Sequence, residues 1–589
     1  MRAATIDVSV ARRAGTRWVT ASLVVLAAAL PLLPTLRAGF IYDDTTIIRD
    51  NAWLRGWGAL AHAWGRPYWP SAGLDVGGLY RPLHVALLAT VWNAVGGVAL
   101  AFHLYALVLY ALVVVLAWRL LRRATCGVPS LLGALWLATH PLHVEAVASV
   151  ANTAELLVAA CTIALTFLLA RGDERETARV DGWGVALAGA ALSAAALLSK
   201  ESGIVALPLA AITAWGWRAP AERIAARELL RRHSRLWLAS GGAIVATLLA
   251  RAVVLGAPVS RVSIAAPGLD SLGPVERVTA VVSVWPRIVG MLVWPTVLSP
   301  YYGPTVLPAQ RGGLALLALL VAGVLVALCI TLARRGDGRP LAALAWLALT
   351  YLPASNLVTA AGPIISDRTL FGATIGVAML LAWAVDRLPR RAWPPAALAV
   401  ALLVARNAAH TARYASVWTS HRGLWEQLVR ASPDEYRGYE LLGIDATARG
   451  DRIRAVTLLA RAFAMEPRDR RLRFEYGQAL YAAGRYADAA SVLAPLLAAS
   501  EVRRERDFVA MYLDAVGRSR GAEGVVAAGT PLLHGEGAAV AALFVGAAHE
   551  QLGRLAAADA AYALGMRAAP GDTLLRSRRA ALETRLPAR

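Results

Sequence analysis

Two adjacent acidic residues, Asp43 and Asp44, directly follow the first apolar run of this chain. Two neighbouring carboxylates repel each other, and the repulsion tends to raise the pKa of one while the other keeps its negative charge. Such a pair at a membrane face can act as a general base. The alternative is a pair of solvated side chains that cap the following helix through Thr45 and Thr46. The spacing of the residues is compatible with both interpretations.

Further ionisable residues stand at the ends of later apolar runs or beside them. They are His140, His143, Glu145, Glu155, Lys200, Glu201, Arg277, Arg287, Asp367 and Arg368. Ionisable residues are costly at span ends and therefore suggest a functional site, although the longer side chains can also reach water by snorkelling. A cavity that holds the two acids with Lys200, Arg368 and Arg287 would suit a phosphate leaving group with a base on the opposite side.

One of these segments contains three groups that can bind a metal ion, namely His140, His143 and Glu145. Its spacing matches no standard ligand pattern, so hydrogen bonding or contact with a donor phosphate is the preferred interpretation. A divalent ion held by the paired acids is the alternative. We therefore expect chemistry that uses no cofactor and no metal.

The composition indicates that a membrane protein carries these residues. Of 589 residues, 58% are hydrophobic and 17% are charged, whereas soluble globular chains have about 45–50% apolar and about 25% charged residues. The same figures exclude intrinsic disorder, and three scattered cysteines are too few for a disulfide framework.

The formal net charge of +21 comes almost entirely from arginine, since Lys200 is the only lysine. Basic clusters that flank apolar spans indicate membrane topology more often than nucleic-acid binding, so we expect no nucleic-acid partner. Abundant arginine and alanine also suggest a GC-rich bacterial coding sequence.

Eleven apolar runs are long enough, or nearly so, to cross roughly 30 Å of hydrocarbon as helices. They are 18–36, 99–120, 129–147, 152–170, 182–199, 203–217, 235–255, 313–334, 340–358, 369–386 and 392–408. Two interrupted runs, 82–97 and 276–298, are expected to lie at one membrane face or dip into it. The first run follows a basic segment and is expected to be an uncleaved signal anchor.

The arginine clusters predict the orientation of these spans. With the N-terminus in the cytoplasm, the clusters within 119–123, 218–235, 334–339 and 387–391 all fall on the cytoplasmic side, as the positive-inside rule requires. The first outer loop, 37–81, and all residues after about 410 then lie outside. We expect a multi-pass protein of the bacterial inner membrane with a periplasmic C-terminal region.

A helical period replaces the apolar runs after about residue 418. Glycines and prolines recur at the roughly 34-residue spacing of tetratricopeptide (TPR) repeats, as in the pairs Pro433 and Pro467, Gly443 and Gly477, and Gly450 and Gly484. Gly477 is expected where two helices cross, and Gly450, Gly484, Gly517 and Gly553 form the series at the turns. This predicts a membrane domain at 1–410 and a TPR solenoid of about four repeats at 411–589, which binds peptide or acts as a spacer.

Several motifs, in order along the chain, resemble the transmembrane and TPR-repeat O-mannosyltransferases and their bacterial relatives. The motifs are Phe40-Ile41-Tyr42-Asp43-Asp44, Tyr80-Arg81-Pro82-Leu83, Phe102-His103, His140-Pro141-Leu142-His143-Val144-Glu145, Leu198-Ser199-Lys200-Glu201-Ser202-Gly203, Ser299-Pro300-Tyr301-Tyr302, Pro353-Ala354-Ser355-Asn356-Leu357 and Asp367-Arg368. The resemblance implies an all-α membrane glycosyltransferase of the C-type fold, with about 11 spans and interfacial helices, followed by a TPR α-solenoid. Its active site would face the lumen or periplasm.

The resemblance also implies an inverting transfer of a mannose-like hexose from a polyprenyl-phosphate donor to a hydroxyl of an exported protein. Asp43 or Asp44 would be the base, and its neighbour would orient the acceptor. Lys200 and Arg368 would steady the departing phosphate, with Arg287 as a further candidate. The expected pocket residues are Tyr80, Arg81, His103, His140, His143, Glu145, Glu201 and Asp367.

The chain departs from the family pattern in two respects. It has Asp367-Arg368 where many members carry Glu-Arg, and its TPR array is short, which leaves the acceptor open between protein, lipid and glycan. A different class of function is a non-enzymatic membrane scaffold that displays the TPR repeats. A transporter or flippase is disfavoured because the ionisable residues cluster at span ends and not at mid-membrane.

Overall fold

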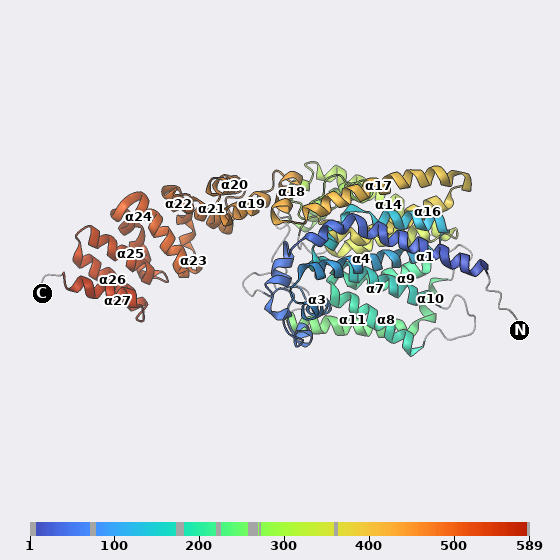
Figure 1. Cartoon of the computed structure of the whole chain (residues 1–589), viewed down its shortest axis with the longest axis horizontal. Coiled ribbons are helices and arrows are strands. Elements are labelled where there is room, and N and C mark those ends of the chain that lie inside the picture. The colour runs from blue at the N-terminus through green and yellow to red at the C-terminus, as the bar shows by residue number, and fades with distance from the viewer. Residues whose placement is uncertain are drawn as a thin grey trace. The chain divides into compact units, whose positions relative to one another are not determined.

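A computed structural model describes residues 8–70, 78–171, 182–218, 225–256, 269, 272–357 and 363–585. All regular elements in these ranges are helices (Figure 1), as predicted. The chain divides after Ala431 into two compact units, which we call the membrane unit and the repeat unit. The predicted boundary at residue 410 lies inside helix α17 (Trp393–Val417). Residues 71–77 of the predicted outer loop and 219–224 of one arginine cluster lie outside the described ranges.

Seven helical segments in the described part of the membrane unit are long and apolar enough to cross a membrane. They are Trp18–Arg37 (within α1, Val8–Ala29, and η1, Leu30–Arg37), Ala99–Leu121 (α4), Val150–Leu169 (η6, Val150–Asn152, and α7, Ala154–Leu169), Ser234–Leu255 (α11), Arg311–Arg334 (α14), Asp367–Arg387 (η11, Asp367–Leu370, and α16, Phe371–Arg387) and Arg390–Val417 (η12, Arg390–Ala392, and α17). Each coincides with one of the predicted spans, and the chain is a multi-pass membrane protein.

The other four predicted spans are shorter helices. They are α5 (Gly127–Ala138), α8 (Trp183–Ser199), η7 (Glu201–Val205) with α9 (Ala206–Gly216), and α15 (Arg339–Tyr351). The prolines Pro141 and Pro353 stand just beyond α5 and α15, and the residue before a proline disfavours the α conformation. Both helices therefore end early, and long helices alone do not reach the predicted count of about 11 spans.

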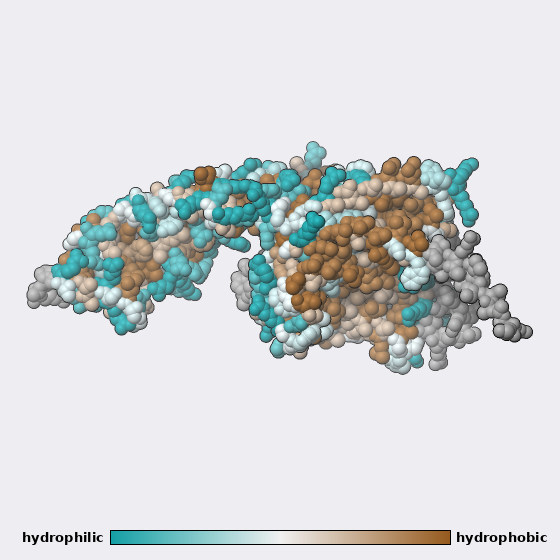
Figure 2. Space-filling model, in the orientation of Figure 1, coloured by the Kyte–Doolittle hydropathy of each residue, from teal (hydrophilic) through white to brown (hydrophobic). Residues whose placement is uncertain are grey.

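Large apolar side chains cover the outside of the membrane unit. On α14, Leu320 is 60% exposed and Val324 is 68% exposed. Figure 2 shows a broad hydrophobic face over α1 and α4, whereas hydrophilic residues predominate on the repeat unit. Exposing such a continuous apolar surface to water is unfavourable, so lipid is the expected surroundings of these helices.

Helix breaks at one end of the membrane unit bring distant segments together. After α5 the chain forms η5 (Pro141–His143) and α6 (Val144–Ala148) before η6 and α7 begin. Helix α6 packs against η1, α4, α17 and η11. Figure 1 shows α3 (Pro82–Val95) near this end and α10 (Ala226–Arg232) at the opposite end of the long helices. We call the end that holds α6 and η11 the site end.

Both predicted interfacial runs form helices. The first is α3, and the second contains α12 (Pro274–Ser283) and α13 (Trp285–Val293). Helix α3 packs against the short helices η3 (Ala52–Leu54), α2 (Ala59–His62) and η4 (Ala63–Gly65) of the first outer loop. The loop is therefore a folded layer of short helices.

A network of buried ions joins three segments of the membrane unit. The Arg339 guanidinium lies 2.9 Å from Asp337 and 2.8 Å from Asp386, and it donates a 2.9 Å hydrogen bond to the carbonyl oxygen of Ala124. Its side chain is only 5% exposed. Charges that are so well buried persist only where partners satisfy them. Here Ala124 and Asp337 lie between helices, and Asp386 lies in the last turn of α16.

The repeat unit is a series of helical hairpins. It comprises α19 (Tyr436–Ala448), α20 (Arg452–Met465), α21 (Arg470–Ala482), α22 (Tyr486–Leu493), η13 (Ala494–Ala498), α23 (Ser500–Arg504), α24 (Arg506–Gly529), η14 (Thr530–His534), α25 (Ala538–Gln551), α26 (Leu555–Ala568) and α27 (Thr573–Glu583). Consecutive helices pack on one another along the series, as in a solenoid.

The glycines of the repeat unit bear out most of the predicted pattern. A Cβ atom on Gly477 would lie 2.4 Å from Leu493, so this position is a helix crossing that tolerates no side chain. Gly450, Gly484 and Gly553 have φ of 76°, 78° and 72° at the hairpin turns. The prediction for Gly517 is wrong: the turn within α24 lies at Gly521, whose φ is 68°.

Candidate functional site

Asp44 is fully buried and caps a helix that begins more than 100 residues later. Its carboxylate accepts hydrogen bonds from the backbone N–H groups of Val150 (3.0 Å) and Ala151 (2.8 Å) and from the Ser149 hydroxyl (3.3 Å). First-turn N–H groups have no partner within their own helix, and a negative group is favoured beside them. Burial raises the pKa of Asp44 to about 7, against the effect of these hydrogen bonds. Asp44 is therefore not the solvated capping residue of the alternative interpretation.

Asp43 has different surroundings, although it is the next residue along the chain. It is half-buried, and none of the described residues donates a hydrogen bond to its carboxylate. The charges that act on it are those of Arg368, Glu145 and Arg81. Burial raises the pKa of Asp43, the two arginines oppose this rise, and Glu145 adds to it. An acid whose pKa is shifted toward neutral pH is a more effective general base.

Arg368 and Glu145 form an ion pair next to Asp43. The Arg368 guanidinium contacts Glu145 directly, and the backbone N–H of Arg368 donates a 2.8 Å hydrogen bond to the same carboxylate. The Ser366 hydroxyl donates a third, of 3.1 Å. Glu145 is wholly buried, whereas the Arg368 side chain is 18% exposed. A guanidinium group has five N–H donors, so Arg368 can bind a further anion without leaving Glu145.

Asp367 serves a different set of partners from its neighbour Arg368. Its buried carboxylate accepts hydrogen bonds from the hydroxyl groups of Tyr302 (2.8 Å) and Tyr414 (3.2 Å). Arg287 is exposed on α13, and its guanidinium carbon lies 5.6 Å from the centre of the Tyr302 ring. Asp367 thus anchors the segment that carries Arg368. Among the described contacts, Arg287 is connected to Asp367 only through Tyr302.

Lys200 and Glu201 also face separate partners. The Lys200 ammonium contacts Glu155 at the start of α7, and the two side chains are 14% and 12% exposed. Glu201 instead lies 2.8 Å from Arg81 and 3.2 Å from Arg251. The ion pairs thus join the end of α8 both to α7 and to the end of the first outer loop.

Tyr80 and His103 hold the first outer loop in place. The Tyr80 hydroxyl donates a 2.8 Å hydrogen bond to the carbonyl oxygen of Trp64, and the Tyr80 backbone N–H points at Glu201, 3.4 Å away. His103 on α4 lies 3.2 Å from the carbonyl oxygen of Gly39, just before the segment that carries the acid pair. Both residues therefore shape the loop and have no direct contact with Asp43.

His140 and His143 are buried, and each is engaged by other parts of the protein. His140 Nε2 lies 3.1 Å from the carbonyl oxygen of Leu292. His143 lies 2.8 Å from both the Tyr110 and the Thr374 hydroxyl oxygens. The hydrogen-bonding role is thus the one that their geometry supports. Among the described residues, no three His, Cys, Asp or Glu side chains are grouped closely enough to hold a metal ion.

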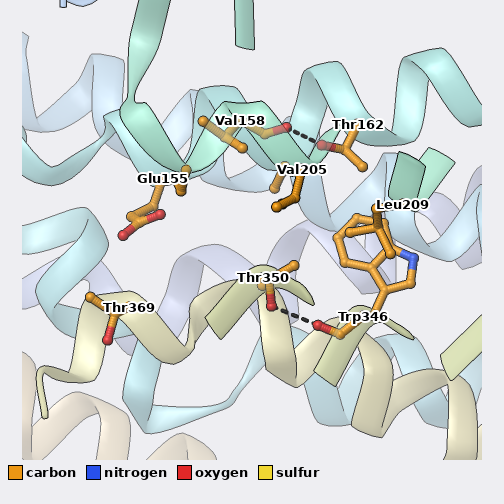
Figure 3. A pocket seen from close by; sticks show the side chains of 11 residues that line it. Glu155, Val158, Thr162, Val205, Leu209, Trp346, Thr350 and Thr369 are labelled. Atoms are coloured by element: carbon orange, nitrogen blue, oxygen red, sulfur yellow. Dashed lines mark hydrogen bonds between the residues drawn. The ribbon is translucent and has the colours of Figure 1, made fainter. Parts of the chain in front are cut away.

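A cleft begins beside these ion pairs and runs between α7, α9 and α15. The cleft is narrow, with about 20 Å³ of room for the centres of water molecules. Figure 3 shows Glu155 and Thr369 on opposite walls at one end and Leu209 and Trp346 at the other. Thr369 directly follows Arg368, and Glu155 is the partner of Lys200. One end of the cleft is thus polar and charged, while Val158, Ala159, Val205 and Leu209 make the rest largely apolar.

The hydroxyl groups of the cleft are not equivalent. Thr162, Thr350 and Thr369 each donate a hydrogen bond to a backbone carbonyl nearby in the chain, at 2.7, 2.6 and 2.7 Å. Ser202 also lines the cleft, and its buried Oγ has no hydrogen-bond partner among the described residues. Ser202 is therefore a hydroxyl that can donate to a bound ligand.

Sequence reasoning missed several residues of this site. Glu155 was expected among the ionisable residues at span ends, but nothing in the spacing pairs it with Lys200. The two tyrosines around Asp367 lie 65 and 47 residues from it, so only the fold brings them together. The N–H groups that bind Asp44 belong to the backbone and leave no signal in side-chain composition.

Comparison with known proteins gives two findings. A tetratricopeptide repeat family matches residues 446–503. The chain is also similar to protein O-mannosyl-transferases of Drosophila melanogaster: it is 34% identical to Tmtc1 over 183 residues, which are 30% of this chain and 20% of that protein. It is 24% identical to Tmtc3 over 520 residues, which are 77% of this chain and 56% of that protein.

A third relative, Tmtc2 of Drosophila melanogaster, is 36% identical over 187 residues, which cover 31% of this chain and 20% of the relative. The matches thus span about a fifth of the length of Tmtc1 and Tmtc2 and somewhat more than half of Tmtc3. The chain is a homologue of protein O-mannosyl-transferases with a TPR region and several membrane spans.

Proposed function

We propose that this protein is an integral-membrane glycosyltransferase that moves a mannose-like hexose from a polyprenyl phosphate to a hydroxyl group of an exported protein. The observation that carries the proposal is the contrast within the acid pair. Asp44 is buried as a helix cap, whereas the half-buried Asp43 has no hydrogen bond from the described residues and faces Arg368 and Glu145. A general base needs a carboxylate that is free to take the proton of the acceptor hydroxyl, and of the two acids only Asp43 has one that is not held by hydrogen bonds from the described residues.

The proposed reaction is a single inverting displacement. The Asp43 carboxylate accepts the proton of the acceptor hydroxyl, and the hydroxyl oxygen forms a bond to the anomeric carbon from the face opposite the phosphate. The bond between that carbon and the phosphate oxygen breaks, and its electron pair leaves with the polyprenyl phosphate. Negative charge therefore grows on the phosphate as the transition state forms, where fixed cations stabilise it most effectively.

Arg368 and Lys200 are the cations that we assign to this phosphate. Each is paired with a buried or nearly buried carboxylate, Glu145 or Glu155. An isolated charge would be strongly disfavoured at such a position, so the acids keep both cations ionised before the donor arrives. Lysine has three N–H donors and arginine five, which leaves donors for phosphate oxygens. Ser202 Oγ is a further donor at this end of the cleft.

The cleft suits an isoprenoid phosphate because its two ends differ in polarity. The charged end would meet the phosphate, and the apolar stretch toward Leu209 and Trp346 would have to widen to take isoprene units. Burial of apolar surface is worth about 25 cal/mol per Å², so a few isoprene units supply substantial affinity. The other expected pocket residues support the site indirectly: Tyr80, Arg81 and His103 hold the outer loop, and His140 and His143 brace the η5–α6 segment.

We further propose that the site end faces away from the cytoplasm. The arginines of 119–123, 334–339 and 387–391 are at the ends of helices opposite the site end, which agrees with the positive-inside rule. In this arrangement α5, α8, α9 and α15 complete about 11 crossings. Their irregular ends are tolerated because they are buried within protein, and the chain after the last crossing is extracytoplasmic.

The test uses the full chain reconstituted in proteoliposomes, with radiolabelled mannosyl polyprenyl phosphate and a serine- and threonine-rich peptide. We expect label on the peptide in the wild type and none with Asp43→Asn. Label found only on lipid or glycan would support the assignment as a glycosyltransferase but contradict a protein acceptor. Absence of transfer from any hexosyl polyprenyl phosphate to any of these acceptors would contradict the proposal.

A further inference from the structure

The residue before Asp43 has an unusual backbone conformation. Tyr42 has a φ of 58°, and Asn356 is the other non-glycine residue in the described chain with a positive φ. A bulky side chain rarely adopts this left-handed region because its Cβ crowds the backbone. Such strain persists only where the surroundings hold it, and it is often found at functional sites. The conformation of Tyr42 determines the direction in which the chain presents Asp43 and Asp44.

The turn at Tyr42 is fixed on both its backbone and its side chain. The carbonyl oxygen of Tyr42 accepts hydrogen bonds from the Thr45 N–H (3.2 Å) and the Thr45 hydroxyl (2.7 Å). Its ring meets the ring of Trp425 edge to face, with 5.7 Å between the centroids. Trp425 is only 6% exposed. An edge-to-face aromatic contact of this kind is a favourable and directional interaction.

Trp425 belongs to α18 (His421–Ala431), the last helix of the membrane unit. The same helix contacts a second part of the site, because the Gln427 side chain donates a 2.8 Å hydrogen bond to the carbonyl oxygen of Leu298. Ser299, the next residue, donates its backbone N–H to the Tyr302 hydroxyl, and that hydroxyl binds Asp367. One helix therefore fastens both the turn that carries Asp43 and the loop that anchors Asp367.

We infer that α18 is a positioning element of the active site and that Trp425 and Tyr42 are positioning residues for Asp43. Trp425 holds the Tyr42 ring, the ring fixes the left-handed turn, and the turn directs the Asp43 carboxylate toward Arg368. The inference rests on the proposed role of Asp43 as the base.

This inference predicts a loss in turnover without a loss in donor binding. With Trp425→Ala in the full-length protein, kcat falls by about tenfold or more, since small displacements of a catalytic group are costly. The KM for mannosyl polyprenyl phosphate stays within about twofold of the wild type, because Lys200 and Arg368 are untouched. Trp425→Phe retains an aromatic ring and restores most of the turnover.

Leu428→Ala is the matched control on the same helix. Leu428 is 2% exposed, so its truncation loosens the packing of α18 without removing the aromatic contact. We expect it to lower the unfolding temperature and to lower kcat clearly less than Trp425→Ala does. An equal loss of kcat in Leu428→Ala and Trp425→Ala, or no rescue by Trp425→Phe, would overturn the inference.

A second measurement does not depend on glycosyl transfer. If Trp425 holds Tyr42 in a strained turn, glycine at position 42 removes the need for it, because glycine adopts positive φ without strain. We therefore expect Trp425→Ala to lower the unfolding temperature less in the Tyr42→Gly background than in the wild type. Additive effects would overturn the inference even if transfer is observed. If the effects of Trp425→Ala and Tyr42→Gly on the unfolding temperature are coupled but the wild type transfers no sugar, the proposed function is contradicted. The positioning of Tyr42 by Trp425 then still holds.

Discussion

The carboxylate of Asp44 accepts a 2.8 Å hydrogen bond from the backbone N–H of Ala151. This contact fixes Asp44 at the first turn of a membrane-spanning helix, where unpaired N–H groups need an acceptor. Asp43, the residue before it, receives no hydrogen bond from the described residues. The two acids of one motif are thereby divided into a structural residue and a candidate base.

The pH dependence of stability should report the burial of Asp44. The pKa of Asp44 is about 7 in the folded protein and about 3.9 in the unfolded chain. At a pH between these two values the folded state therefore binds more protons than the unfolded state. Its contribution to stability is therefore greatest at low pH and is lost as the pH rises toward 7 and above. We expect the unfolding temperature of the wild type, relative to Asp44→Asn, to increase as the pH is lowered from 8 to 5. A difference that instead increases with pH would contradict this assignment.

Replacement of Arg368 by lysine should weaken donor binding although the charge is kept. The guanidinium contacts Glu145 and has further donors for phosphate, whereas an ammonium group lacks the planar fork that binds two oxygens at once. We expect the donor KM to rise by about tenfold or more, with the acceptor KM little changed. The matched control is Arg49→Lys, because Arg49 is 54% exposed and, among the described residues, is paired with its neighbour Asp50 alone. Equal KM values for the two variants would remove Arg368 from the phosphate site.

The ion network of Arg339 should matter for stability and not for substrate binding. Arg339→Met leaves the carboxylates of Asp337 and Asp386 without their shared partner at a largely buried position. The expected cost is about 3–5 kcal/mol, measured as a lower unfolding temperature in detergent. Arg387→Met should cost only about 0–1 kcal/mol, because Arg387 is 52% exposed although it also contacts Asp337. Similar effects of both variants would show that burial does not set the strength of this network.

A side chain at Gly477 should disrupt one hairpin of the repeat unit. A Cβ there would lie 2.4 Å from Leu493, and forcing apart a packed helix crossing costs about 1–3 kcal/mol. We expect Gly477→Val to increase amide hydrogen exchange in α21 and α22, with little change in the exchange of the membrane helices. Gln478→Ala is the control, since Gln478 is exposed on the same helix. Protection equal to that of the wild type would mean that the crossing is not packed as described.

The sequence predicted the elements of this protein better than the contacts between them. Apolar run length identified the seven long spans, and the recurrence of Gly450 and Gly484 identified the hairpin turns, because both signals are local. The early ends of α5 and α15 were missed because the length of an apolar run takes no account of Pro141 and Pro353, which follow the two helices. The turn at Gly521 was missed because the irregular length of α24 breaks the repeat spacing.

The same distinction applies to the candidate site, where residue types were predicted better than the contacts between them. The charged residues at span ends were predicted together, and the fold does place Arg368, Glu145 and Asp43 near one another. Which aspartate is accessible could not be predicted, because the answer depends on the backbone of residues 149–151 and on the positive φ of Tyr42. The histidines were expected in the pocket, yet their partners are a hydroxyl pair and a carbonyl oxygen from distant helices.

The most direct test of the account is single-turnover transfer by Asp43→Asn and Asp44→Asn in proteoliposomes, with unfolding temperatures measured on the same samples. Asparagine has the shape of aspartate but cannot accept the proton of a hydroxyl, so Asp43→Asn should lose about 100-fold or more of the rate while its unfolding temperature stays near that of the wild type. Asp44→Asn should change stability and retain measurable transfer. Full activity of Asp43→Asn, or a complete loss confined to Asp44→Asn in a folded protein, would contradict the assignment of Asp43 as the base.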